Sequence, residues 1–490
     1  MTSNRSIGKN VAVSMFWSFM ERIAAQVVSV IVGIILARLL TPDEYGIISI
    51  VMIFITLCDV FVTSGFGTAL VQKKEVSSVD YNTTFWLSFG ISLVLYIILF
   101  FFAPHIARFY YLELLTPIIR VFGIRLILTS LNTIQIAKVQ REMAFKKYFI
   151  STISGTVVSC VIGVAMAFSG YGVWALVAQY LSNTFTATVI FSFVCGWLPR
   201  FQFSFQKVKE IWRFGSKVLG ANLIRTGVLE MQSFLVGKCF GAADLAVMDQ
   251  GKKYPSLLVS NVNSSISNVM LPFFSKSQDR MDALKENLRR TIKISNFILA
   301  PLLLGFCAVA PTFVDVFLTS KWSACIPYIQ IFSIMYLTRP LTMICHQVLL
   351  AINKAGVAMW LMVVINSVTL GGALISALLL KDMFCIAVFL LIADIIALVG
   401  FMISMKIYLS WRIKEQLIDV LPPILRAVIM CLIVWSLPYY FKVSGVVLLV
   451  LQILVGVVIY IALSALFRDD SFLWFFRKVK DVFYRKYKVE

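Results

Sequence analysis

The sequence predicts an all-α integral membrane protein with about fourteen transmembrane helices. Of its 490 residues, 60% are hydrophobic and only 14% are charged, more apolar surface than a soluble chain of this length could bury. Apolar stretches of about twenty residues, each long enough to cross a bilayer as a helix, recur along the whole chain. Most of the 44 lysines and arginines fall in alternate connections between these stretches, as the positive-inside rule requires.

This distribution also fixes the expected orientation. An even number of spans with basic alternate connections predicts a multi-pass membrane protein with both termini in the cytoplasm. The net charge of +20 then reflects topology, and we expect no binding to nucleic acid. The expected spans are residues 11–37, 47–70, 84–107, 114–137, 148–169, 172–196, 214–238, 254–275, 291–317, 325–350, 356–380, 384–405, 422–441 and 445–467.

An internal repeat divides the chain. The segment FAPHIARF at 102–109 closes the third span, and the similar VAPTFVDVF at 309–317 closes the ninth. Six spans per repeat is an even number, so both repeats have one orientation and an axis along the membrane normal relates them. We therefore predict two six-helix lobes in a pseudo-twofold arrangement around a central cavity. The expected parts are an N-terminal lobe (1–212), a C-terminal lobe (213–410), and an added helix hairpin with a basic amphipathic cytoplasmic tail (411–490).

The first span is unusually polar. Glu21 and Arg22 lie near its midpoint, where a charge costs roughly 2.5–3.5 kcal/mol on insertion scales. Ser18, Arg22 and Gln26 are four residues apart and share one helix face. A membrane helix with such a stripe is expected to face a hydrated interior, not lipid.

Two short motifs indicate a family. The run ILARLLTPDEYG at 35–46 follows the helix that carries the central arginine, and a Trp-x-Phe-Gly motif at 212–215 precedes the seventh span. With these motifs the chain resembles polysaccharide exporters and Wzx-type flippases of O-antigen and exopolysaccharide. Their MOP superfamily also holds the lipid II flippases and the MATE exporters. The resemblance implies alternating access around a cavity lined by the first two helices of each half.

Deep arginines suggest what this cavity binds. Arg22 and Arg225 lie on the first helix of each half, and Arg125 and Arg339 lie on the fourth. Guanidinium groups bind phosphate oxygens with two parallel hydrogen bonds, so we predict that these four side chains bind a diphosphate. The alternative interpretation is that they form structural ion pairs with carboxylates in the spans.

Other polar residues in the spans have two possible roles. Hydroxyl and amide groups suit sugar hydroxyls, but they also hold membrane helices together at about 0.6 kcal/mol per bond. The predicted cavity lining comprises Ser18, Gln26, Asp59, Asn222, Asn261, Ser264 and Asn268. The carboxylates that could couple transport to H⁺ or Na⁺ are Glu21, Asp59, Glu230 and Asp394.

Catalytic motifs are missing from the sequence. There is no Gly-x-x-x-x-Gly-Lys-[Ser/Thr] loop, no Gly-x-Ser-x-Gly and no His-Glu-x-x-His. Nine scattered cysteines and two histidines predict neither a disulfide nor a metal site, and no cofactor is expected. The sequence thus favours a transporter over an enzyme.

We expect a monomeric flippase that translocates polyprenyl-diphosphate-linked oligosaccharide repeat units, of the undecaprenyl type, for surface polysaccharide biosynthesis. Its expected partners are this substrate, membrane lipids, a coupling H⁺ or Na⁺, and a glycan polymerase. Two alternatives stay open. One is a MATE-like cation-coupled drug antiporter, and the other is a membrane glycan polymerase or ligase.

Overall fold

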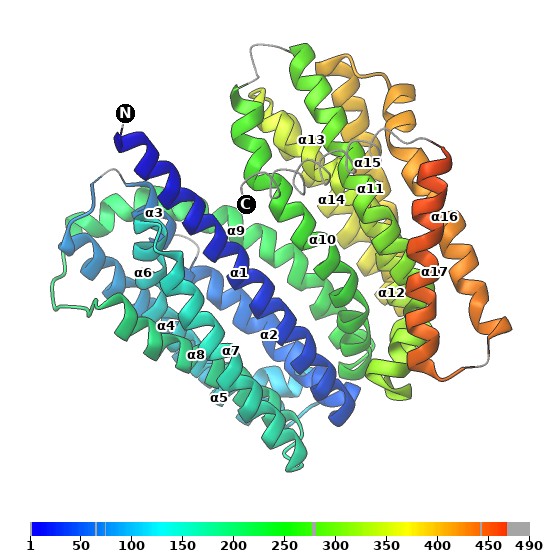
Figure 1. Ribbon diagram of the computed structural model, residues 1–490. Helices are drawn as coiled ribbons and strands as arrows, with labels where there is room; N and C mark the ends of the chain where they lie inside the picture. Colours follow the sequence, from blue (N-terminus) through cyan, green and yellow to red (C-terminus); the bar gives the residue numbers. More distant parts are fainter. Residues whose placement is uncertain (1, 64–65, 74, 277–280, 442, 468–490) are drawn as a thin grey trace, which may run out of the picture. The chain divides into compact units, whose positions relative to one another are not determined.

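The computed structural model of the protein describes residues 2–63, 66–73, 75–276, 281–441 and 443–467. These residues form helices joined by short turns, and no strand occurs among them (Figure 1). The predicted all-α class is confirmed. Several predicted site side chains lie outside the described part, so the predictions about them stay predictions: Ser18, Arg22, Asn261, Ser264 and Asn268.

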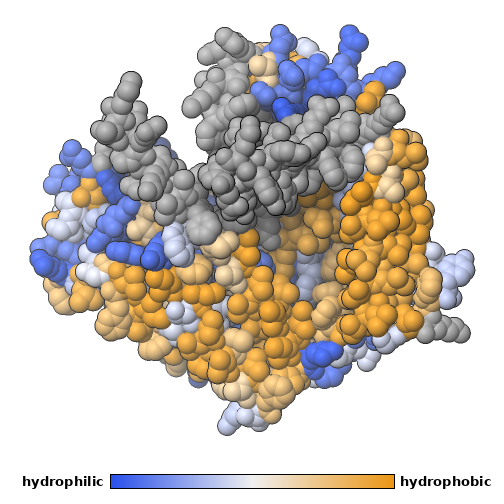
Figure 2. Space-filling model, viewed as in Figure 1, coloured by the Kyte–Doolittle hydropathy of each residue, from blue (hydrophilic) through white to orange (hydrophobic). Residues whose placement is uncertain are grey.

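The membrane character is plain from the helices themselves. Within the described ranges, nine helices are long and apolar enough to cross a bilayer. Hydrophobic side chains cover the outer face of the last two helices, and only a minority of the residues in these helices are buried (Figure 2). The chain is therefore a multi-pass membrane protein. The other expected spans fall on helices that carry polar or charged residues, or that are broken in the middle, and the count of fourteen stays a prediction.

The chain forms two compact units, residues 1–246 and 247–490. In unit 1, α7 packs against both α1 and α8, α6 packs against α4 and α8, and α2 packs against α9. The lobe boundary near residue 212, expected from the repeat, stays a prediction. The helices of unit 1 are α1 (Thr2–Leu39), α2 (Pro42–Thr63), α3 (Phe66–Gln72), α4 (Ser78–Tyr110), α5 (Leu115–Phe122), α6 (Ile124–Glu142), α7 (Phe145–Phe168), α8 (Val173–Cys195), α9 (Phe205–Cys239) and the first turn of α10 (Ala242–Lys276).

The contacts at the start of α2 explain the turn motif at residues 41–46 in physical terms. Thr41 and Glu44 cap the helix reciprocally: the Thr41 backbone N–H donates to Glu44 Oε2 at 2.7 Å, and the Glu44 N–H donates to Thr41 Oγ1 at 3.4 Å. One turn into the helix, Gly46 lies directly against the backbone of Ala242 at the start of α10. A Cβ on Gly46 would lie 1.8 Å from the Ala242 carbonyl oxygen. The glycine is what permits this close approach of two helices.

We expect Gly46→Ala to lower the stability of the protein by about 1–3 kcal/mol, the usual cost of forcing extra volume into a packed contact. The reason is that the methyl group would meet backbone atoms, which cannot rotate away. Thermal unfolding of the purified protein in detergent measures the loss. The matched control is Gly90→Ala in α4, where a Cβ meets nothing within 4 Å and alanine favours the helix. Equal melting temperatures for the two variants would contradict the assignment.

Unit 2 contains the rest of α10 and the helices that follow it. Its core forms where α11 packs against α12, α16 and α17, and where α14 packs against α15. The elements are α11 (Met281–Phe313), η1 (Val314–Leu318), η2 (Ser320–Cys325), α12 (Ile326–Met335), η3 (Tyr336–Thr338), α13 (Arg339–Ala351), α14 (Ala355–Ile375), η4 (Ser376–Leu380), α15 (Met383–Leu409), α16 (Ile413–Tyr440) and α17 (Gly445–Leu466).

Ion pairs at one end and apolar contacts along their length attach the α16–α17 hairpin to α11. Asp419 of α16 has a fully buried side chain and accepts two hydrogen bonds from Arg289 of α11, at 2.6 and 3.0 Å. Lys293 Nζ lies 3.1 Å from the same carboxylate. Farther along, the Tyr460 hydroxyl of α17 donates to the Phe297 carbonyl at 3.0 Å. These contacts hold the hairpin in one register along α11.

Candidate functional site

In each unit an arginine lies just after an interruption in a helix. In unit 1 the chain turns at Gly123, between α5 and α6, and Arg125 lies in the first turn of α6. In unit 2, Arg339 is the first residue of α13, and Pro340 behind it lacks the N–H that would continue α12. A helix N-terminus carries partial positive charge, so an arginine there adds to the attraction for anions.

In unit 1 the arginine faces a carboxylate of α2. Arg125 Nη2 lies 3.6 Å from Asp59 Oδ2, and Arg125 Nη1 lies 3.7 Å from Met52 Sδ. Only 22% of the Arg125 side chain and 19% of the Asp59 side chain are exposed. The second carboxylate oxygen, Asp59 Oδ1, is buried and has no hydrogen-bond partner among the described residues. The pair is therefore loose, with one acceptor atom unused.

In unit 2 the corresponding pair is more open. Arg339 Nε lies 3.2 Å from Asp394 Oδ2 of α15, and its guanidinium lies 5.4 Å from the centre of the Tyr336 ring. The Arg339 side chain is 45% exposed, whereas the Asp394 side chain is 13% exposed. The contact is close, but it lacks the alignment of a hydrogen bond. Arg339 therefore keeps donor groups that an anion could reach.

Arg225 differs from both of these arginines. It lies near the middle of α9, its side chain is exposed, and no ion pair to it occurs among the residues that the structure describes. A carboxylate partner, which the alternative interpretation requires, is missing for this residue. Arg225 is therefore an available guanidinium in a helix predicted to cross the bilayer.

The remaining predicted site residues are distributed over α1 and α9. Gln26 and Glu21 are half-buried on α1, and Asn222 and Glu230 are half-buried on α9. Three members of the predicted diphosphate site, Arg22, Arg125 and Arg225, belong to unit 1, and Arg339 belongs to unit 2. The structure thus pairs two arginines predicted to bind diphosphate with two carboxylates predicted to bind coupling ions.

Some polar residues of unit 1 connect helices instead of lining a cavity. The Asn132 side-chain amide of α6 donates to Thr188 Oγ1 of α8 at 2.7 Å. One turn along, Gln135 donates to Ser192 Oγ at 3.0 Å. These contacts show that Asn132, Gln135, Thr188 and Ser192 connect α6 to α8.

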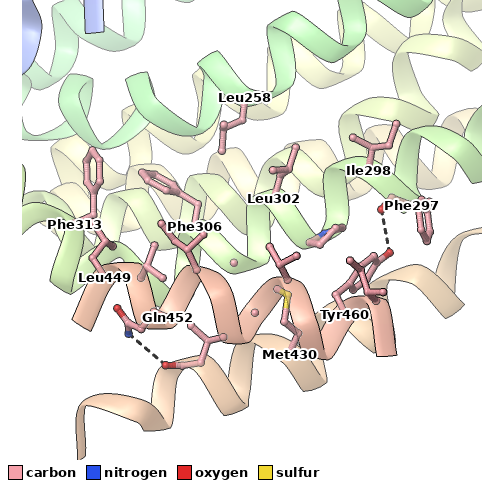
Figure 3. A pocket seen from close by; sticks show the side chains of 18 of the residues that line it. Leu258, Phe297, Ile298, Leu302, Phe306, Phe313, Met430, Leu449, Gln452 and Tyr460 are labelled. Atoms are coloured by element: carbon pink, nitrogen blue, oxygen red, sulfur yellow. Dashed lines mark hydrogen bonds between the residues drawn. The ribbon is translucent and has the colours of Figure 1, made fainter. Parts of the chain in front are cut away.

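An apolar groove in unit 2 escaped the sequence analysis, because its lining carries no polar or charged pattern. The cavity has a volume of about 650 Å³ and lies along α11, α16 and α17 (Figure 3). Leu302, Phe306 and Met430 line it, and the Phe297–Tyr460 hydrogen bond lies at one end. Near the other end, the Gln452 side-chain amide donates to the Val434 carbonyl at 3.3 Å (Figure 3).

These features define a class of protein: a polytopic membrane transporter with arginines in its spans. Comparison of its sequence with those of known proteins supports this class. Residues 35–327 match the family model described as polysaccharide biosynthesis protein. The chain is 22% identical over 463 residues to the succinoglycan biosynthesis transport protein ExoT of Rhizobium meliloti, covering 94% of this chain and 93% of that one. It is 23% identical over 307 residues to the lipopolysaccharide biosynthesis protein WzxC of Escherichia coli, covering 62% of each chain.

Comparison of structures gives the fold. The lipid II flippase MurJ in an inward closed conformation matches with a TM-score of 0.74 and 15% identity, covering 94% of this chain and 99% of that one. An inward-facing multidrug transporter of the MATE family matches with a TM-score of 0.62 and 14% identity, covering 81% and 96%. The chain belongs to the polysaccharide biosynthesis protein family, and the predicted Wzx-type resemblance within the MOP superfamily is confirmed.

Proposed function

We propose that this protein is a flippase that moves polyprenyl-diphosphate-linked oligosaccharide repeat units outward across the bacterial inner membrane by alternating access. The observation that carries the proposal is Arg225, an exposed arginine in a helix predicted to cross the bilayer, in a chain from a polysaccharide biosynthesis family. A guanidinium there needs an anionic partner, and the diphosphate of a lipid-linked sugar supplies one. The relatives that bear transport or lipopolysaccharide names support the same substrate class.

In this proposal the four arginines have unequal roles. Arg225 and Arg22 bind the diphosphate directly. Arg339 of unit 2 keeps the donor groups that Asp394 leaves free, whereas Arg125 is mainly engaged with Asp59. The fourteen-span count, the central cavity and the cytoplasmic position of both termini are further parts of the proposal.

The two loosely paired carboxylates suit ion coupling. Among the described residues, no group donates a hydrogen bond to the buried atoms Asp59 Oδ1 and Asp394 Oδ2, a costly arrangement for a charged group. Uptake of H⁺ or Na⁺ would satisfy that oxygen and weaken the hold of the carboxylate on its arginine. The arginine would then be freed for the diphosphate, which links ion binding to substrate binding.

The groove of unit 2 is suited to the prenyl chain. Its lining is apolar, and it follows helices whose outer faces are hydrophobic (Figures 2 and 3). Because the bilayer around the tail is as apolar as the groove, the tail would be held by van der Waals packing against the lining and not by exclusion from water.

We expect Gly305→Phe to reduce export severely while leaving the fold intact. Gly305 lines the groove, and a Cβ there meets only the Met430 terminal methyl, at 3.4 Å, so the backbone accepts a side chain. A phenyl ring would then occupy space that the tail needs. Surface glycan in a complemented deletion strain measures export, and Gly305→Ala is the matched control. Wild-type export by a correctly inserted Gly305→Phe protein would exclude the groove as the tail site.

The proposed function is tested by locating the substrate in cells that lack the protein. We expect lipid-linked single repeat units to accumulate on the inner leaflet, protected in spheroplasts from a membrane-impermeant sugar-oxidising enzyme. Accumulation on the outer leaflet would instead indicate a polymerase or ligase. Unchanged surface glycan together with a new sensitivity to cationic drugs would indicate a MATE-like antiporter.

A further inference from the structure

The connection between α8 and α9 (196–204) and the first turns of α9 (205–213) are attached to the rest of unit 1 by hydrogen bonds, and we name residues 196–213 the α8–α9 strap. The Arg200 carbonyl accepts from Trp86 Nε1 of α4 at 3.0 Å, and the Arg200 N–H donates to Asn82 Oδ1 at 3.0 Å. Asn82 Nδ2 in turn donates to Gln202 Oε1 at 3.0 Å. The strap is therefore an ordered surface of unit 1 whose outward side chains have defined positions.

Those outward side chains are large and hydrophobic. Phe201 is 91% exposed, Phe205 is 83% exposed and Leu198 is 72% exposed. One face of the Phe201 ring stacks on Trp86, with ring centres 4.5 Å apart, which leaves the other face open. Exposed aromatic rings beside the end of a membrane helix are typical of the membrane–water interface.

The charged side chains of the strap fall into two groups, a cluster of ion pairs and a set of further cations. Glu210 pairs with Lys73 at 3.2 Å and with Lys207 at 3.5 Å, and its hydrogen bond from Lys73 holds the pKa of Glu210 below its ordinary value. Asp80 of α4 pairs with the same two lysines. This cluster is self-contained, with two cations and two anions.

Three further cations lie outside that cluster: Arg200, Lys209 and Arg213. All three side chains are exposed, and none forms an ion pair within the described ranges. The hydrogen bonds of Arg200 described above involve its backbone, so its guanidinium is available. The strap therefore has a surplus of positive charge beside its exposed rings.

We propose that the α8–α9 strap binds anionic phospholipid headgroups. The phenyl rings and Leu198 enter the interfacial layer, and the three cations contact headgroup phosphates. A lipid surface fits better than an acidic protein, because the strap begins where the apolar α8 ends and so lies at the level of the membrane surface. The rule that places basic connections inside also places the strap on the cytoplasmic leaflet, where anionic lipids attract basic segments.

The test uses the full-length protein in detergent, titrated with phosphatidylglycerol or phosphatidylcholine and observed by native mass spectrometry. We expect tighter binding of phosphatidylglycerol, and a loss of roughly fivefold for each cation removed in Arg200→Ala/Lys209→Ala/Arg213→Ala. The matched control, Lys406→Ala/Arg412→Ala/Lys414→Ala, removes three exposed cations from the last turn of α15, the α15–α16 connection and the first turn of α16, and should keep the preference. A strap variant that retains the preference, or a control that loses it equally, overturns the proposal.

Hydrogen exchange in nanodiscs locates the lipid independently. We expect amides of residues 197–205 to exchange more slowly in discs containing phosphatidylglycerol than in phosphatidylcholine discs, and the difference to vanish in the triple strap variant. Protection that appears only when cytoplasmic extract is added to phosphatidylcholine discs, with none from phosphatidylglycerol, would identify a protein as the occupant and overturn the proposal.

Discussion

Arg225→Ala is expected to reduce export of surface glycan to the level of the deletion strain, while the protein still inserts at normal abundance. The exposed guanidinium has no carboxylate partner in the described part of the chain, so its removal leaves no buried charge behind and should not unfold the protein. The loss would be one of substrate binding. Each charge-assisted hydrogen bond contributes about 1.5–3 kcal/mol, so the loss of two such bonds would lower the affinity for the substrate more than a hundredfold.

Two variants separate binding from folding at this position. Arg225→Lys keeps the charge but loses the planar, two-pronged geometry, so we expect partial export. Arg120→Ala removes an arginine whose Nε donates to the Phe100 carbonyl at 3.3 Å and whose guanidinium lies 4.5 Å from the Phe100 ring centre. That role is structural, so stability should fall more than export. Wild-type amounts of surface glycan with Arg225→Ala would show that Arg225 does not bind the diphosphate. The proposed function would then lose the residue on which it depends.

Composition and charge placement sufficed to predict the helical membrane fold, because the bilayer admits few ways to satisfy a backbone. The internal repeat could be recognised in the sequence because the third and ninth predicted spans end with similar segments. The sequence placed Arg125 and Arg339 on matching helices, but it could not show that each follows a helix break. The interruption in unit 1 is Gly123 alone, whose backbone stays helical, whereas in unit 2 it is the 3-10 turn Tyr336–Thr338, so no common motif marks the two positions.

The pairing of these arginines with Asp59 and Asp394 was also beyond the sequence. Asp59 lies on α2 and comes before Arg125 in the sequence, whereas Asp394 lies on α15 and comes after Arg339. The two pairs therefore have no common sequence spacing. The packing of the helices, which depends on their shape along the whole contact, brings each arginine next to its carboxylate. The groove along α11 was missed for a related reason, since an apolar lining in a membrane protein does not stand out from its apolar surroundings.

The second large effect is expected at the Arg339–Asp394 pair. Arg339→Gln leaves Asp394 as a buried carboxylate with no cation, and breaking such a pair costs about 3–5 kcal/mol when both partners are covered. Because Arg339 is 45% exposed, we expect the lower end of that range. The carboxylate can take up a proton instead, so the melting temperature of Arg339→Gln should recover as the pH is lowered. Thermal unfolding across a pH series measures this recovery.

The double variant Arg339→Gln/Asp394→Asn separates stability from transport. It removes both charges and keeps similar side-chain volumes, so stability should return toward wild type while export stays low, because neither the anion-binding nor the ion-binding group remains. The same pair of changes at Arg125 and Asp59 should restore stability and retain more export, since that arginine is covered and less able to reach a substrate. Restored export in the unit 2 double variant would show that Arg339 and Asp394 serve only each other.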